Sequence, residues 1–320
     1  MSDLGVDIFN ARDLRERLTG GVRKAGREVV FLVGSALTAP TVAEGPGVPG
    51  VGGVIKLIES EFDEAQQNEL RMECAGADNP YQAAFQFLLR RRGQQEVNGV
   101  IRQAVARARV IPADGPATPY AIGASTPEDV CRSFDADTAG WHLAPGVEAL
   151  GRLAAGWPES FGRTILTTNF DPLLSVAVSR AGGRTFRTML HRDGDIGQST
   201  GEATQVVHLH GYWHGADTLH TPRQLGQARP QLKASLAKLL RDKIVVVCAY
   251  GGWDDVFTKA LVDVVVEDSS YPEVIWTIRD QAPALRPALV DLLAPGIDRG
   301  RVGFYGGVDC HSFLPALAAE

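Results

Sequence analysis

The sequence predicts an α/β fold, a doubly wound, Rossmann-like parallel sheet with a mainly helical insertion. Short β-branched or apolar runs alternate with helical stretches, which is typical of a parallel sheet covered by helices. The run at residues 244–248 (IVVVC) has no polar interruption, as a strand covered on both faces requires. A chain of 320 residues, 44% of them hydrophobic, is long enough to bury a full core.

Five strands and a weaker sixth are expected, at residues 29–33, 164–168, 205–209, 244–248, 274–278 and 301–305. Helices are expected at residues 54–61, 145–156, 172–180 and 256–266. Between the first two strands, residues 81–108 are helical by composition and residues 111–127 are rich in proline and glycine. We therefore expect one domain over residues 1–320, with a helical insertion within it at approximately residues 60–142.

Charge and cysteine content narrow the class of protein. The chain has 32 basic and 38 acidic side chains, a net charge of −6, so we expect no direct binding of nucleic acid. Its four cysteines are too few and too scattered for a disulfide framework, and no two form a Cys-x-x-Cys pair, which favours a cytoplasmic protein. No apolar run approaches the ~18 residues of a membrane helix, and the N-terminus does not resemble an export signal.

A glycine-rich segment follows the first strand. The strand runs into Gly34, Ser35 and Thr38, and a loop rich in glycine at residues 45–53 precedes the next helix. This order is typical of a phosphate-binding turn, because backbone N–H groups can converge on an anion there. Three of the loop glycines spell Gly-x-Gly-x-x-Gly, but they lie well past the strand and two prolines among them remove donors. A plain surface loop remains the alternative for residues 45–53.

Polar side chains follow the second and third strands. Asp171 is placed to cap the helix at residues 172–180, whereas Asn169 has no such structural role and indicates a ligand contact. His210 precedes a glycine and could act as a general base. His208 lies two residues earlier, so the pair could instead be half of a metal site, or His208 could be a core histidine.

The fourth strand also ends in glycines. Gly251 and Gly252 follow it, and Asp254 and Asp255 stand at the start of the next helix. Acids at this position complement the helix dipole, and we favour that explanation for Asp255. Because the carboxyl ends of parallel strands meet at one edge of a sheet, one cleft should collect the residues that follow these four strands.

This ordered set resembles the sirtuin-like proteins, in particular the shorter bacterial members that consume NAD in anti-phage defence. The matching positions, over residues 29–310, are Gly34-Ser35, Asn169-Phe170-Asp171, His210-Gly211 and Tyr250-Gly251-Gly252. The chain departs from the protein deacylases of the family in having no pair of Cys-x-x-Cys motifs, so their zinc module is missing and the helical insertion stands in its place. The first motif also lacks one of the family's glycines.

The resemblance implies an NAD+ glycohydrolase (an N-glycosidase) that takes NAD+ as substrate, needs no metal or other cofactor, and releases nicotinamide and ADP-ribose. In that mechanism Asn169 orients the ribose and the attacking water, Asp171 holds the nicotinamide carboxamide, and His210 takes a proton. Binding of NAD+ would involve the remaining matched or neighbouring positions, Gly34, Ser35, Thr38, Phe170, Gly251, Gly252 and Asp254.

The same resemblance implies a regulated effector that depletes cellular NAD+ and works as a homo-oligomer, with a separate ATPase or sensor partner or a fused C-terminal domain. Two alternatives remain open. One is a non-catalytic sensor of NAD or ADP-ribose, and the other is an NAD-dependent protein deacylase or ADP-ribosyltransferase.

Overall fold

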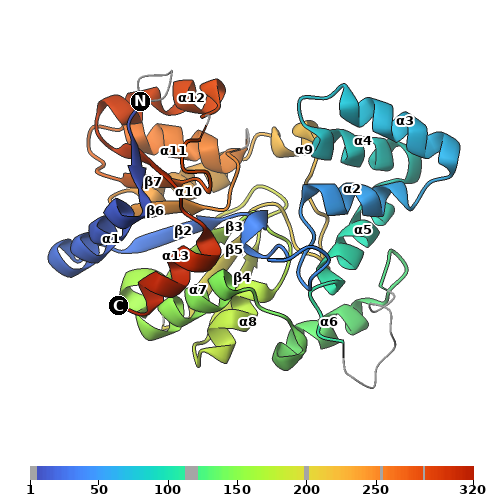
Figure 1. Cartoon of the computed structure of the whole chain (residues 1–320), viewed down its shortest axis with the longest axis horizontal. Coiled ribbons are helices and arrows are strands. Elements are labelled where there is room, and N and C mark those ends of the chain that lie inside the picture. Colours follow the sequence, from blue (N-terminus) through green and yellow to red (C-terminus); the bar gives the residue numbers. More distant parts are fainter. Residues whose placement is uncertain (1–5, 112–121, 198–201, 253–254, 284) are drawn as a thin grey trace.

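The computed structural model describes residues 6–111, 122–197, 202–252, 255–283 and 285–320. Within these ranges eight parallel strands form one sheet in the order β1-β8-β7-β6-β2-β3-β5-β4 (Figure 1). The α/β class and the Rossmann-like parallel sheet are therefore confirmed. The strands are β1 (Ile8–Asn10), β2 (Val29–Val33), β3 (Thr164–Thr167), β4 (Thr185–Met189), β5 (Thr204–His208), β6 (Ile244–Cys248), β7 (Glu273–Thr277) and β8 (Val302–Gly306).

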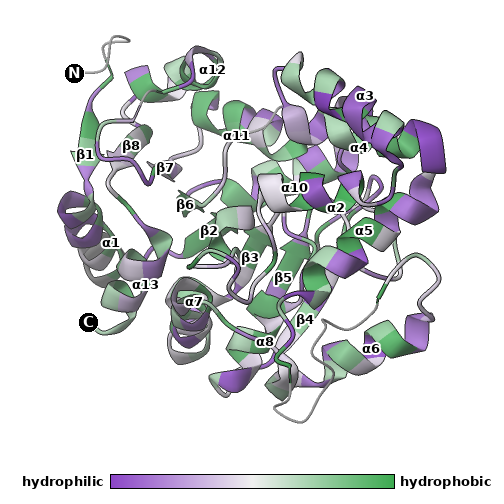
Figure 2. Ribbon diagram, turned by 45° about the vertical axis from the view of Figure 1, so that its right-hand side comes forward, coloured by the Kyte–Doolittle hydropathy of each residue, from purple (hydrophilic) through white to green (hydrophobic). Residues whose placement is uncertain are grey.

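The two most apolar strands, β2 and β6, lie side by side in the middle of the sheet and are buried along their whole length. Side chains of a strand alternate between its faces, so Phe31 and Val246 join the core on one face while Leu32 and Val247 join the core on the other. Figure 2 shows the concentration of hydrophobic residues in the central strands. Burial on both faces explains why these strands have no polar residue.

Helices cover both faces of the sheet. One face packs against α1 (Ala11–Ala25), α7 (Pro145–Gly156), α8 (Leu173–Arg180) and α13 (Cys310–Ala318). The other packs against α10 (Pro230–Leu240), α11 (Val256–Val266) and α12 (Pro287–Asp298). The short elements are α9 (Pro222–Leu225), the 3₁₀ turns η1 (Ser35–Leu37) and η2 (Thr138–Gly140), and the π-helical turn η3 (Pro158–Gly162). Among the described residues, no helix is both long and apolar enough to cross a membrane.

The segment between β2 and β3 is helical. It contains α2 (Val51–Glu59), α3 (Glu64–Ala75), α4 (Pro80–Arg92), α5 (Gln94–Ala106) and α6 (Glu128–Ala136). Helices α2 to α5 form a group at one side of the sheet (Figure 1). The helical stretch expected at residues 81–108 is two helices, because Gly93 takes a φ of 84° that ends α4 before α5 begins. Most of the Pro/Gly-rich stretch lies outside the described residues.

The sheet has two strands that the sequence did not predict, β1 and β4, and both lie at its edges. An edge strand is covered less completely and needs no continuous apolar run. The strand order places a switch point at β2, because the chain continues from β2 to β3 on one side and later returns to β6 on the other. In open α/β sheets this arrangement leaves a crevice at the carboxyl ends of the strands, and that crevice is where ligands bind.

Candidate active site

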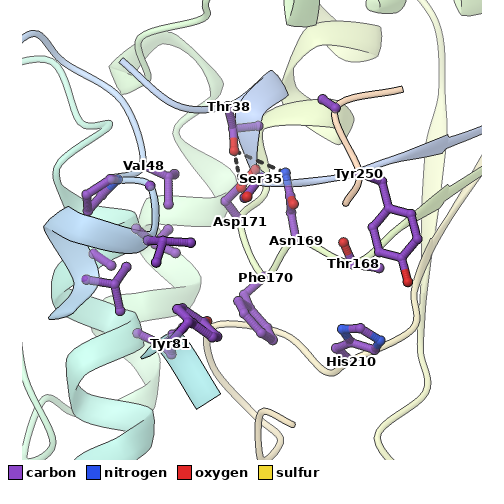
Figure 3. Close-up of a pocket in the computed structure, with 18 of the residues that line it drawn as sticks. Ser35, Thr38, Val48, Tyr81, Thr168, Asn169, Phe170, Asp171, His210 and Tyr250 are labelled. Carbon is purple, nitrogen blue, oxygen red and sulfur yellow. Dashed lines mark hydrogen bonds between the residues drawn. The ribbon is translucent and has the colours of Figure 1, made fainter. Parts of the chain in front are cut away.

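A cavity lies at the carboxyl ends of β2, β3, β5 and β6. It is the crevice expected at the switch point. Side chains that follow the strands form one wall (Figure 3), and they include Ser35, Thr38, Thr168, Asn169, Phe170, Asp171, His210 and Tyr250. The opposite wall is apolar and comes from the glycine-rich loop and the insertion. The structure thus brings the three predicted catalytic residues, Asn169, Asp171 and His210, into one cavity.

The turn after β2 requires glycine at position 34 because the backbone after β6 packs closely against it. A Cβ on Gly34 would lie 2.9 Å from the Cα of Tyr250 and closer still to the carbonyl oxygen of Ala249. The Gly34 N–H donates to the Cys248 carbonyl, which ties the ends of β2 and β6 together. Gly34 itself does not line the cavity, whereas Ser35 and Thr38 of the following turn do. The glycine therefore allows the two strands to approach and lets the turn reach the cavity.

Two hydrogen bonds donated by the side-chain amide of Asn169 fix the orientation of this side chain. Its Nδ2 donates to the Gly34 carbonyl at 3.2 Å and to Thr38 Oγ1 at 3.1 Å, so both amide protons are used. Its main-chain N–H donates to Thr167 Oγ1. Within the described residues nothing hydrogen-bonds to Oδ1. The side chain can therefore accept a hydrogen bond from a hydroxyl group or a water in the cavity.

Asp171 is a buried carboxylate with no ion pair within the described residues. Its Oδ2 accepts from the Thr38 hydroxyl at 3.0 Å, and its Oδ1 accepts from the Leu173 N–H at 3.1 Å, in the first turn of α8. The prediction that Asp171 is the helix cap is wrong, because α8 begins one residue later and its N-cap is Pro172; Asp171 stands just before the cap and still accepts from the Leu173 N–H. Burial raises the pKa of Asp171 to about 6, and the two hydrogen bonds only partly oppose that rise.

The two histidines at the carboxyl end of β5, His208 and His210, have different environments. His208 is fully buried, and its Nδ1 lies 2.8 Å from the Asn169 carbonyl oxygen. Burial lowers the pKa of His208 to about 4, so its ring is neutral and donates that hydrogen bond. His208 does not line the cavity and instead fixes the main chain of Asn169. No group of three or more potential metal ligands is found in the described part of the chain.

His210 lines the cavity, and a buried carboxylate orients it. Its Nε2 lies 3.1 Å from Asp255 Oδ2, and the Tyr250 hydroxyl donates to the same oxygen at 2.7 Å. The next residue, Gly211, has a φ of 97°, a backbone conformation that favours glycine. Burial opposes ionisation of Asp255, but hydrogen bonds, first of all the one from His210, outweigh it and lower the pKa of this carboxyl.

Asp255 is also the N-cap of α11, at the start of the helix where the sequence favoured an acid that complements the helix dipole. Its contact with His210 was not predicted, because the two residues are far apart in the chain. Of the other predicted binding positions, Phe170 and Gly251 line the cavity. Gly252 does not line this cavity, and a Cβ at this position would instead meet Trp276 and residues of α12. Asp254 lies outside the described residues.

The insertion contributes residues that the sequence gave no reason to select. Tyr81 of α4 and Ile101, Ala104 and Val105 of α5 form much of the apolar wall. The Tyr81 hydroxyl lies 3.0 Å from His220 Nδ1, and burial raises the pKa of this phenol, so it stays protonated. An aromatic or aliphatic side chain at helical spacing carries no signal that separates a cavity wall from a core.

A second cavity adjoins the first at Ala249, Tyr250 and Gly251. It continues along the carboxyl ends of β7 and β8 toward α12 and α13, and its lining includes Trp276, Arg279, Arg286 and His311. The two cavities share the segment that follows β6. Together they form an elongated site that crosses the switch point, with a largely apolar part beside the insertion and a part with cationic side chains beside α12.

Comparison with known proteins agrees with this arrangement. No curated protein matches the chain. The family model of the SIR2-like domain matches residues 163–292, which include Asn169, Asp171, His210 and Asp255. The turn at Gly34 and Ser35 lies outside the matched region. Over residues 163–292 the chain thus matches the SIR2-like domain, which confirms the resemblance to the sirtuin-like family.

Proposed function

We propose that this protein is an NAD+ glycohydrolase that converts NAD+ and water to nicotinamide and ADP-ribose. The observation that carries the proposal is the meeting of an amide, a carboxylate and an imidazole, from Asn169, Asp171 and His210, in the switch-point cavity of a SIR2-like domain. Each of these groups has the hydrogen-bonding capacity that the reaction needs.

The elongated site suits a dinucleotide. In our proposal the nicotinamide riboside half occupies the cavity beside the insertion, and the adenosine half extends into the second cavity. The diphosphate passes the turn at Ser35 and Thr38 and the backbone at Gly251, where the two cavities adjoin. Arg279 and Arg286 supply positive charge on the adenosine side.

Cleavage breaks the bond between the ribose and the nicotinamide nitrogen and passes through an oxocarbenium-like ribose. The electron pair of that bond leaves with nicotinamide. Asp171 accepts hydrogen bonds from the carboxamide N–H groups of the leaving base, and Asn169 Oδ1 accepts one from a ribose hydroxyl or from the attacking water. The water oxygen bonds to the ribose carbon, and its proton passes to His210.

Water is the proposed acceptor because the helical insertion stands in place of the zinc module that the protein deacylases of the family have. Its side chains in the cavity wall, Tyr81, Ile101, Ala104 and Val105, offer an aromatic ring and aliphatic groups rather than a path lined with polar groups. The sequence also lacks the cysteine pairs of the zinc-bearing deacylases. In cells the activity would be gated, since an unregulated enzyme would exhaust NAD+. A regulated role in bacterial anti-phage defence, with homo-oligomerisation or a partner protein as the gate, follows from the sirtuin-like resemblance.

The test is incubation of the purified protein with NAD+ and chromatographic detection of nicotinamide and ADP-ribose. Asn169→Ala and His210→Ala should each abolish product formation while the protein stays folded. Asn68→Ala, on the exposed surface of α3, is the matched control and should retain full activity. NAD+ binding without turnover would instead indicate a sensor, and release of acetate from an acetylated peptide would indicate a deacylase.

A further inference from the structure

We propose that Asp255 is a positioning residue that holds His210 in the tautomer whose Nδ1 accepts the proton from water. The inference rests on the proposed hydrolysis and adds a residue to it that touches no substrate. It starts from the observation that the two oxygens of one buried carboxylate have separate roles.

The first oxygen, Oδ1, has the structural role. It accepts from the N–H groups of Phe257 and Thr258 at 3.0 and 3.1 Å, as an N-cap does. These bonds satisfy donors of the first turn of α11 and would be sufficient for capping. Asp63, the N-cap of α3, shows what capping alone requires, because its side chain is exposed and caps the helix through the Gln66 N–H.

The second oxygen, Oδ2, has no part in the cap and accepts from His210 and Tyr250. The Asp255 side chain is 0% exposed and that of His210 is 7% exposed, so little water competes for this contact. A charge buried for capping alone would be unfavourable, because a cap at the surface costs no desolvation. The position of Oδ2 is explained when its partner His210 is included.

A buried cation offsets part of the cost. Arg229 is 5% exposed, and its Nη1 donates to the carbonyl oxygens of Leu209 and Leu190, whereas its Nε and Nη2 have no hydrogen-bond partner among the residues that the structure describes. Its charge is close enough to Asp255 for the two to interact, although burial lowers the pKa of Arg229 more than Asp255 and Asp193 raise it. Since Leu209 precedes His210, the same guanidinium also fixes the main chain from which His210 extends.

The carboxylate determines which ring nitrogen of His210 carries the proton. An ionised carboxylate can only accept, so an imidazole with a single ring proton keeps it on Nε2 and has its lone pair on Nδ1. No hydrogen bond reaches Nδ1 within the described part of the chain. The nearby His220 is kept neutral by burial, which lowers its pKa well below the ordinary value. Asp255 therefore leaves Nδ1 as the proton-accepting nitrogen of a histidine that lines the cavity.

Asp255→Asn separates the two roles. The amide oxygen can still cap α11, but an N–H group then faces Nε2 and the imidazole must move its proton to Nδ1. With NAD+ as substrate, kcat should fall about 10²- to 10⁴-fold, with KM changed less than about threefold and the melting temperature within a few degrees of the wild type. Asp63→Asn, the same change at a cap that touches no site residue, should leave kcat and KM unchanged.

The second measurement is the ¹⁵N NMR spectrum of the His210 ring at neutral pH. The wild type should show a protonated Nε2 and an unprotonated Nδ1, and Asp255→Asn should reverse them. The inference is overturned if kcat of Asp255→Asn stays within threefold of the wild type, or if the wild type carries its ring proton on Nδ1. Wild-type protein that does not hydrolyse NAD+ refutes the proposed function, whereas the ring-nitrogen signals still decide the positioning. If Asp255→Asn does not fold, the ring-nitrogen signals of the wild type alone test the positioning of His210.

Discussion

Replacement of Asp171 by asparagine should stabilise the protein while it impairs the reaction. The carboxylate is 2% exposed and has no ion pair within the described residues, so the folded chain holds it at a cost. Its pKa of about 6 in the folded chain lies above the ordinary value of 3.8. Folding therefore favours the protonated acid, and stability is lost as the pH rises from about 4 through 6. A difference of this size corresponds to about 3 kcal/mol at pH 7.5 and about half of that at pH 5.

Asparagine keeps the size of the side chain and removes the charge. Its oxygen can still accept from the Leu173 N–H, and its amino group can donate to Thr38 Oγ1. We expect Asp171→Asn to raise the free energy of unfolding by up to about 3 kcal/mol at pH 7.5 and by about half as much at pH 5. The same change replaces an acceptor by a donor where the nicotinamide carboxamide would bind, so kcat/KM for NAD+ should fall.

Urea denaturation of both proteins at the two pH values, followed by circular dichroism, measures the difference. A variant less stable than the wild type at pH 7.5 would refute the reasoning, as would a stability gain that is the same at both pH values. Asp63→Asn, at an exposed helix cap, controls for the general effect of removing one negative charge and should show no gain that depends on pH in this way.

Two further substitutions test the framework of the site. Gly34→Ala should lower the free energy of unfolding by more than about 2 kcal/mol, because its Cβ would meet the backbone of Ala249 and Tyr250. The control is Gly20→Ala in α1, which has open space around it and should be neutral or stabilising. Equal effects of the two substitutions in urea denaturation would contradict the packing argument. Arg229→Met should cost about 2 kcal/mol or more and reduce kcat, because it frees the Leu209 and Leu190 carbonyls and removes positive charge near Asp255. Arg132→Met on the surface of α6 is its control, and unchanged melting and turnover in Arg229→Met would count against a structural charge at that position.

The parts of the fold that the sequence predicts well are those with the strongest burial. Strands such as β2 and β6 are recognisable because both faces must be apolar, whereas β1 has three residues and β4 (TFRTM) mixes polar and apolar positions at an edge. The helical split at Gly93 depends on a single positive φ. Local composition cannot reveal such features, because tertiary contacts decide them.

For the site, the order of strands is enough to bring Asn169, Asp171 and His210 together, since parallel strands end at one edge of the sheet. The partners of these residues could not be predicted in the same way. Helix capping explains Asp255 locally and completely, so nothing in the sequence indicates that its second oxygen meets His210. Tyr81 reaches the cavity from an insertion whose packing direction the sequence does not specify.

The hydrogen bonds around Thr38 suggest why the site can be ready before substrate binds. Its hydroxyl accepts from Asn169 and donates to Asp171, so one group on the turn after β2 fixes both side chains that follow β3. His208 fixes the Asn169 main chain from the other side. Preorganised dipoles and charges stabilise a transition state more effectively than groups that must reorient. Since all these bonds come from sheet ends, whereas α4 and α5 supply apolar walls, the chemistry and the choice of ligand are carried by different parts of the chain.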